Sequence, residues 1–114
     1  MADPGIAEVN KQLLPDGTAR VQVSGEIDVS TASAMTDSVL ALLDDGARSI
    51  EVDLSGVTFM DSSGLNGLVR VGSRAKERAV ELVVVDPTPR VYKTMEITGV
   101  NRVLTVRRGV HPAP

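Results

Sequence analysis

The chain has 114 residues, a net charge of -3 at neutral pH and no cysteine. A chain of this length is expected to form one domain that buries about two thirds of its unfolded surface. The lack of cysteine excludes disulfides and thiolate metal sites, and the acidic balance argues against nucleic acid, whose binding needs clustered Lys and Arg. Without a signal peptide or an apolar run of about 20 residues, we expect a cytoplasmic protein with no membrane contact.

The first part of the chain predicts a β-hairpin and then a helix. The run LLPDGTARVQVSGEID contains two strand-like segments around a Pro-Asp-Gly turn at residues 15–17. From Thr31 onward, apolar residues recur three or four positions apart, with Ser30 or Thr31 as the cap and Gly46 at the exit. The expected buried stripe of this helix is Ala32, Met35, Val39, Leu42 and Leu43.

Strands and helices alternate in the remainder. SIEVDL at residues 49–54 alternates as a third strand, and AVELVVVD at 79–86 is apolar on both parities in its second half, like a central strand. A short helix then starts with Thr88 as cap and Pro89 at its first position and stops at Gly99, before RVLTV forms a fifth strand. The helix between the third and fourth strands has the apolar stripe Leu65, Leu68, Val69, Gly72 and Ala75.

The order of these elements predicts the fold class. A strand-helix-strand connection within one sheet is almost always right-handed and parallel, whereas the opening hairpin is antiparallel. The clean alternation of the second and third strands leaves one sheet face polar, so the helices should lie mainly on the other face. We therefore predict a two-layer α/β domain over residues 6–107, with a mixed sheet of about five strands and flexible ends at residues 1–5 and 108–114.

The sequence lacks the residues that several common types of active site require. The single histidine, His111, lies in a Pro-flanked tail, so no Ser-His-Asp triad can be built from regular elements. The chain contains neither a Gly-rich nucleotide loop nor the G-x-S-x-G turn of hydrolases, and we expect no catalytic residue, metal ligand or cofactor. One alternative stays open, in which Asp28, Asp53 and Asp61 near strand ends gather Mg²⁺ as in receiver-type phosphoacceptor domains.

The stretch TFMDSSGLN, residues 58–66, places a carboxylate, two hydroxyls and a glycine between a strand and a helix. The purely structural explanation is that Asp61 or Ser62 caps the helix. One cap needs only one side chain, however, and Gly64 weakens the first helical turn by about 1 kcal/mol relative to alanine. We therefore interpret Gly64 as space that lets another protein approach Ser63.

Three motifs, in order, resemble the STAS domain family and specifically the bacterial anti-sigma-factor antagonists. They are GEIDVSTA at 25–32, VDLSGVTFMDSSGL at 52–65, and a strand followed by Pro and a short helix that ends in ITGV. The resemblance implies a mixed sheet with helices on one side. It also implies that an anti-sigma factor, an ATP-dependent serine kinase, phosphorylates Ser63, with the adjacent Ser62 as the second choice, and that a phosphoserine phosphatase reverses the modification.

The resemblance further implies a partner-binding surface, because Asp28 matches the acidic residue of the loop beside the phosphorylation loop. The expected surface comprises Asp28, Thr31, Asp61, Ser62, Ser63, Gly64 and Leu65. Phe59 is either its neighbour or part of the core. The unphosphorylated chain, itself no enzyme, is expected to bind the anti-sigma factor and free the sigma factor. The alternative is a STAS docking module of a transporter or stress-signalling complex that has no kinase cycle.

Overall fold

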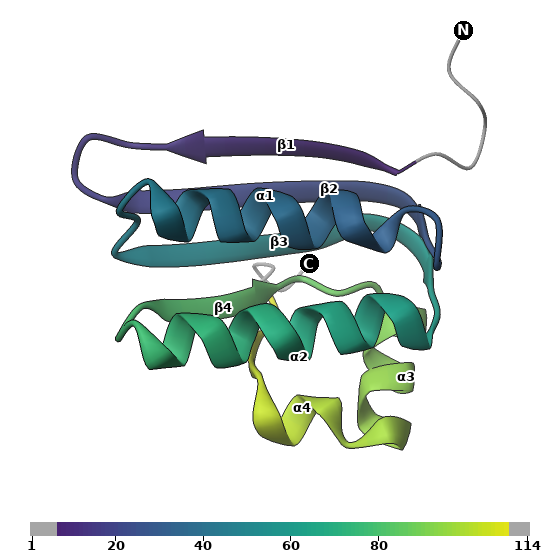
Figure 1. Ribbon diagram of the computed structural model, residues 1–114. Coiled ribbons are helices and arrows are strands. Elements are labelled where there is room, and N and C mark those ends of the chain that lie inside the picture. Colours follow the sequence, from purple (N-terminus) through teal and green to yellow (C-terminus); the bar gives the residue numbers. More distant parts are fainter. Residues whose placement is uncertain (1–6, 110–114) are drawn as a thin grey trace, which may run out of the picture.

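The computed structural model describes residues 7–109 (Figure 1). Residues 1–6 and 110–114, which contain His111 and most of the two predicted flexible ends, lie outside the described part. No helix within residues 7–109 is both long enough and apolar enough to cross a membrane. The elements are β1 (Glu8–Leu13), β2 (Thr18–Ile27), α1 (Ala32–Asp44), β3 (Ser49–Met60), α2 (Ser62–Glu77), β4 (Glu81–Val85), α3 (Pro89–Thr98), α4 (Val100–Val103) and β5 (Thr105–Arg107).

One five-stranded sheet has the order β1-β2-β3-β4-β5. β1 pairs antiparallel with β2, and every other neighbouring pair is parallel, as the sequence predicts. The hairpin turn is closed by the N–H of Gly17, which donates to the carbonyl of Leu14 at 3.0 Å. Gly17 has φ of 93°, a left-handed conformation that strains residues with a side chain, and this explains the glycine after Pro-Asp.

The helices α1 and α2 lie side by side across one face of the sheet, and α3 and α4 lie beyond α2 (Figure 1). The core lies between these two layers, which confirms the predicted two-layer arrangement. Burial of an apolar side chain in this core contributes about 1.5–3 kcal/mol, so the core between the sheet and the helices is the main source of stability. The fully buried side chains include Val21, Ile50, Val52, Leu54 and Val84 from the strands and Met35, Val39, Leu68, Val71 and Met95 from the helices.

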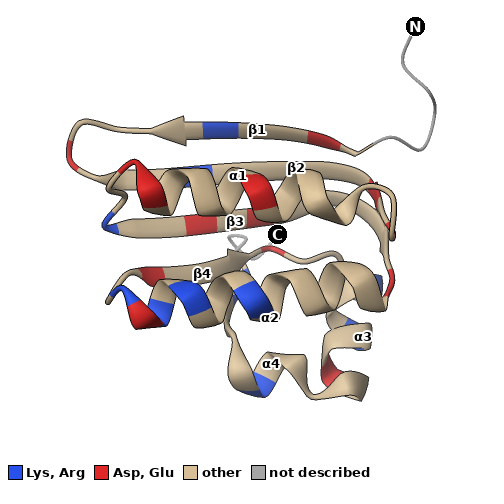
Figure 2. Ribbon diagram, viewed as in Figure 1, with Lys and Arg blue, Asp and Glu red and all other residues tan. Residues whose placement is uncertain are grey.

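The opposite face of the sheet carries charged side chains. Arg20 and Asp53 form an ion pair at 3.1 Å, and Arg107 pairs with Glu51. Burial raises the pKa of Asp53, but hydrogen bonds from Ser55 and the positive charge of Arg20 outweigh burial and hold that pKa below its ordinary value. The two long helices differ in charge. The charged residues of α1 are all acidic, whereas those in the second half of α2 are mostly basic (Figure 2).

β3 runs to Met60, whereas the sequence predicts a strand only over residues 49–54. Its pairing with β2 contains two register shifts in the second half. Each shift breaks the two-residue repeat of inward-facing side chains, so that Val57 and Met60 are buried with two exposed residues between them. This part of the strand therefore lacks the alternation that identifies a strand in a sequence.

The end of the chain differs from the prediction at one element. Arg102 and Val103, assigned to the fifth strand, lie instead in the short helix α4, and β5 contains only Thr105–Arg107. α3 starts and stops as predicted, with Thr88 as its N-cap and Gly99 in the left-handed conformation at its end.

Candidate functional site

The predicted phosphoacceptor block joins β3 to α2, and Asp61 caps the helix. Its Oδ1 atom accepts the backbone N–H of Ser63 at 2.8 Å and that of Gly64 at 3.4 Å. The N–H of Asp61 donates in turn to the carbonyl of Ile27 at 3.1 Å, which ties this loop to the end of β2. Of the two predicted capping candidates, Asp61 is the cap, and Ser62 is the exposed first residue of α2.

The hydroxyl of Ser63 has contact with solvent. Ser63 is partly exposed, and its side chain forms no hydrogen bond within residues 7–109. No side-chain oxygen or nitrogen in this part of the chain is both buried and without a partner, so a hydroxyl without a partner must reach water. The oxygen of Ser63 is therefore accessible to another molecule at the positive end of the α2 dipole.

Gly64 and Leu65 face the interior of the domain. A Cβ atom at Gly64 would lie 2.5 Å from Cγ of Met60 and 2.8 Å from Cγ2 of Ile27. Leu65 is only 3% exposed. The interpretation of Gly64 as space for an approaching protein is therefore wrong, because the glycine lets α2 pack closely against the ends of β2 and β3. Both residues lie beneath the expected contact surface and present no side chain on it.

The rest of α2 is held against α1 and the sheet in the same way. A Cβ atom at Gly67 would lie 2.6 Å from Cγ2 of Thr36 on α1. Val71, which is absent from the predicted stripe, is buried, while Val69 is only half-buried. The close packing fixes the helix that presents Ser63.

A second loop, between β2 and α1, presents Asp28. Its Oδ1 atom accepts the backbone N–H of Ser30 at 2.9 Å and the hydroxyl of Ser30 at 2.7 Å. The side-chain hydrogen bond from Ser30, followed by the backbone one, holds the pKa of Asp28 below its ordinary value. The Asp28 carboxylate is therefore ionised at neutral pH and held in one orientation.

The Thr31 hydroxyl closes this second loop. It accepts the N–H of Asp28 at 2.9 Å and donates to the carbonyl of Glu26 at 2.9 Å. Thr31 is the N-cap residue of α1, one of the two predicted candidates, but its side chain makes no capping hydrogen bond. The hydroxyl stabilises the loop instead of the helix end.

The two loops lie at the same end of the sheet, because each follows the carboxyl end of one of two adjacent parallel strands. Ile27, the last residue of β2, pairs with Met60, the last residue of β3. Two apolar side chains add to this end, since Phe59 is 40% exposed rather than part of the core, and Val29 is 81% exposed. Val29 was not predicted as a site residue, because an isolated valine in a loop gives no sequence signal for exposure.

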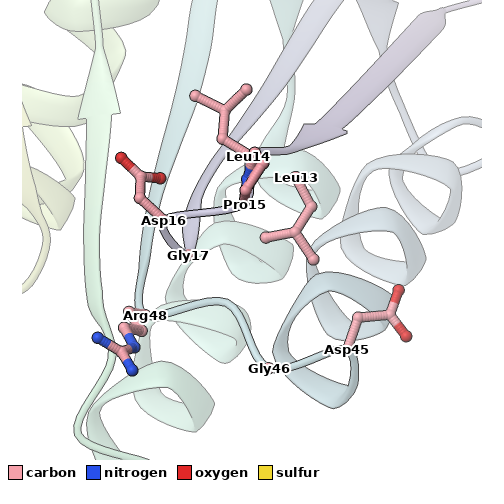
Figure 3. Close-up of a pocket in the computed structure, with 8 residues that line it drawn as sticks. All are labelled: Leu13, Leu14, Pro15, Asp16, Gly17, Asp45, Gly46 and Arg48. Carbon is pink, nitrogen blue, oxygen red and sulfur yellow. The ribbon is translucent and has the colours of Figure 1, made fainter.

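A separate surface hollow of about 720 Å³ lies beside the β1–β2 turn and the end of α1 (Figure 3). Leu13 and Leu14 form its apolar part. The carboxylate of Asp16 accepts the N–H of Thr18 at 2.9 Å. The carboxylate of Asp45 points away from the other labelled residues of the hollow (Figure 3). Because its polar groups do not converge, this hollow does not compete with the Ser63 loop as a functional site.

The three carboxylates of the receiver-type alternative do not meet. Asp28 and Asp61 lie in the two loops, whereas Asp53 forms its ion pair with Arg20 on the open face of the sheet. Across residues 7–109, no group of three His, Cys, Asp or Glu side chains is placed to hold a metal ion. The Mg²⁺-dependent phosphoacceptor alternative is therefore wrong.

Comparison with known proteins confirms the resemblance. The family model described as "Mlab, STAS domain" matches residues 12–106. An anti-sigma-B factor antagonist of Staphylococcus aureus is 33% identical over 89 residues, which is 78% of this chain and 82% of that protein.

Solved structures agree with this assignment. The crystal structure of an anti-sigma factor antagonist from Mycobacterium paratuberculosis has a TM-score of 0.81 and 27% identity, covering 94% of this chain and 90% of that one. The Bacillus cell fate determinant SpoIIAA in its phosphorylated form shares the fold, with a TM-score of 0.71 and 17% identity over 91% and 93% of the two chains. With its mixed sheet and the DSSG block at the start of α2, the chain belongs to the STAS domain family.

Proposed function

We propose that this chain is an anti-sigma-factor antagonist switched by phosphorylation of Ser63. The unphosphorylated form binds an anti-sigma factor and so frees a sigma factor, and phosphorylation releases the partner. The observation that carries the proposal is the solvent-open hydroxyl of Ser63 at the start of α2, next to the loop that presents Asp28. The names of the relatives from Staphylococcus aureus and Mycobacterium paratuberculosis support the class of partner.

The contact surface combines fixed polar groups with two apolar side chains. Gly64 and Leu65 shape it from beneath, since both are buried. Val29 and Phe59 supply the exposed apolar area that an interface buries at its centre. The polar members are Asp28, Thr31, Asp61, Ser62 and Ser63.

A phosphate on Ser63 changes this surface without unfolding the domain. It adds a charge of about -1.5 to -2 at a helix N-terminus, where negative charge is favourable within the protein. Asp61 already accepts the N–H groups of Ser63 and Gly64, so the phosphate charge is left facing the partner. A loss of about 3 kcal/mol at the interface lowers the affinity more than a hundredfold, which is sufficient for release.

The transfer requires chemistry that the partner supplies. The Ser63 oxygen attacks the γ-phosphorus of ATP, the bond to the ADP oxygen breaks, and the hydroxyl proton passes to a base of the kinase. The kinase also provides Mg²⁺ and the nucleotide site, because the chain has no Gly-rich nucleotide loop. This chain is a substrate and not an enzyme, and a phosphoserine phosphatase restores the hydroxyl by hydrolysis.

Three substitutions test the switch with purified kinase and ATP. Ser63→Ala should keep partner binding and lose phosphate incorporation, and Ser63→Asp should weaken binding about a hundredfold. Ser62→Ala is the matched control, because it removes the neighbouring hydroxyl and keeps Ser63, and it should still incorporate phosphate. Equal labelling of Ser63→Ala and the wild type would overturn the proposal. If a transporter or stress-signalling partner binds the chain and no partner kinase labels it, the docking-module alternative replaces the switch.

A further inference from the structure

Opposite charges are separated between the neighbouring helices α1 and α2. Figure 2 shows only acidic positions on α1, mostly basic positions on the second half of α2, and a further basic position on α4. The segment of residues 70–78 contains Arg70, Arg74, Lys76 and Arg78 and only one carboxylate, Glu77. Residues 21–47, by contrast, contain no Lys or Arg, and their charged side chains are Glu26, Asp28, Asp37, Asp44 and Asp45.

Two arginines of α2 remain available to a partner. Arg70 is exposed and forms no ion pair with any residue of the described range. Among the described residues, Arg74 pairs only with Glu77, in an exposed pair at 3.8 Å, and such pairs contribute about 0–1 kcal/mol. Arg78, in contrast, is held by Asp44 of α1 at 2.8 Å. Within residues 7–109, Arg70 therefore has no carboxylate partner and Arg74 has only this weak one.

Arg70 and Arg74 lie on the same side of α2 as Ser63, about two and three helical turns further along. At a rise of about 1.5 Å per residue, they are roughly 10 and 16 Å from Ser63 along the helix axis. An ordinary interface covers about 800 Å² of each partner, a patch roughly 30 Å across. A protein docked on the Ser63 hydroxyl therefore covers Arg70, and it meets Arg74 at the rim of such a patch.

We propose that the kinase docked on Ser63 carries an acidic segment that lies along Arg70 and Arg74. This assignment rests on the proposed function. It adds that the kinase surface facing Arg70 and Arg74 is acidic. A long polyanion such as DNA or an anionic bilayer fits the surface poorly, since it would also meet the carboxylates of α1 in a chain of net charge -3. A protein partner presents acidic groups opposite α2 alone.

Exposed complementary charges act mainly on the rate of association and on its salt dependence. Charge reversal with Arg70→Glu/Arg74→Glu should lower the association rate at least about tenfold at low salt. The difference from the wild type should shrink toward about 1 M salt, where the screening length falls to roughly 3 Å. Because Ser63 is untouched, the bound double variant should still accept phosphate.

The experiment measures binding to the anti-sigma kinase that labels Ser63, by surface plasmon resonance over a series of salt concentrations. The matched control is Lys11→Glu/Lys93→Glu, which makes the same charge change at exposed positions on β1 and α3. Circular dichroism verifies that both variants fold. We expect the control to associate within about twofold of the wild type, as for charges outside the interface.

Two results overturn the partner assignment while the switch stands. In the first, Arg70→Glu/Arg74→Glu associates like the wild type and Ser63→Asp still releases the kinase. In the second, duplex DNA or vesicles with anionic lipid bind the wild type more tightly than the kinase does, and the double variant loses that binding. If Ser63→Ala is labelled like the wild type, the proposed function fails first, and the assignment of the partner fails with it.

Discussion

The Oδ1 atom of Asp61 accepts the backbone N–H of Ser63 at 2.8 Å, so the cap of α2 is bonded directly to the proposed phosphoacceptor. The bond fixes the backbone of Ser63, while the Ser63 hydroxyl forms no hydrogen bond within residues 7–109. One carboxylate thus stabilises the helix and orients the residue that reacts. The sequence alone therefore cannot show whether Asp61 is present to cap the helix or to orient Ser63.

Replacement of Asp61 by alanine should lower the free energy of unfolding by about 1 kcal/mol, because the N–H groups of Ser63 and Gly64 lose their acceptor. Asp61→Asn should retain most of the stability. Urea denaturation measures both effects. Asn66→Ala, at an exposed position on the same helix, is the control and should change stability little. Equal stability of Asp61→Ala and the wild type would contradict the capping role.

Gly64→Ala should destabilise the domain despite the helix propensity of alanine. The added methyl group meets Met60 and the stiff β-branched Ile27, and overpacking of this kind costs about 1–3 kcal/mol. The gain in helix propensity is only about 1 kcal/mol. Thermal unfolding measures the net effect, with Ser73→Ala on the exposed side of α2 as control. A more stable Gly64→Ala protein would show that α2 can move away from the sheet.

The low pKa of Asp53 predicts a pH dependence of stability. Because the folded-state pKa lies below the ordinary value, the ionised Asp53 stabilises the fold above about pH 4, and this contribution is lost as pH falls through the folded-state pKa. Asp53→Asn should cost up to about 1 kcal/mol at neutral pH, because the half-exposed Arg20 loses its charged partner. The variant should also lose less stability than the wild type on acidification.

Urea denaturation at a series of pH values, from neutral to below the ordinary carboxyl pKa of about 4, follows the loss of this contribution. Glu81→Gln removes an exposed carboxylate on β4 and serves as the control. Parallel pH curves for Asp53→Asn and the wild type would show that this ion pair does not contribute to acid sensitivity.

Thr31→Val should loosen the loop that presents Asp28 and leave the core intact. The N–H of Asp28 loses its acceptor, and a bond of about 1 kcal/mol corresponds to roughly fivefold in affinity for the anti-sigma kinase. Hydrogen exchange at Asp28 should accelerate. Ser38→Ala, which removes a hydroxyl bonded within α1, is the control. Unchanged exchange and unchanged affinity in Thr31→Val would exclude a role for this hydroxyl in positioning the loop.

Elements with local signals were predictable from the sequence. The start of α3 is signalled by Thr88 and Pro89 and its end by Gly99, which are neighbours in sequence of the residues that they cap. The buried stripe of α1 follows from spacing alone. The extension of β3 to Met60 was not predictable, because its register shifts depend on pairing with β2.

The site follows the same division. The resemblance places Ser63, and the structure shows that its hydroxyl is open. The role of Gly64 could not be predicted, because it depends on Met60 and Ile27, which reach it only through tertiary packing. The use of the Thr31 hydroxyl depends likewise on where the carbonyl of Glu26 lies.

The hydrogen bond from the N–H of Asp61 to the carbonyl of Ile27 uses backbone atoms only. Such a link survives replacement of side chains but not a change in loop length. Insertion or deletion of one residue just after Met60 would shift Ser62 and Ser63 relative to the loop that presents Asp28. Both loops of the proposed contact surface would then be misplaced. The geometry of this loop therefore depends more on the number of residues between β3 and α2 than on the side chains that the loop carries.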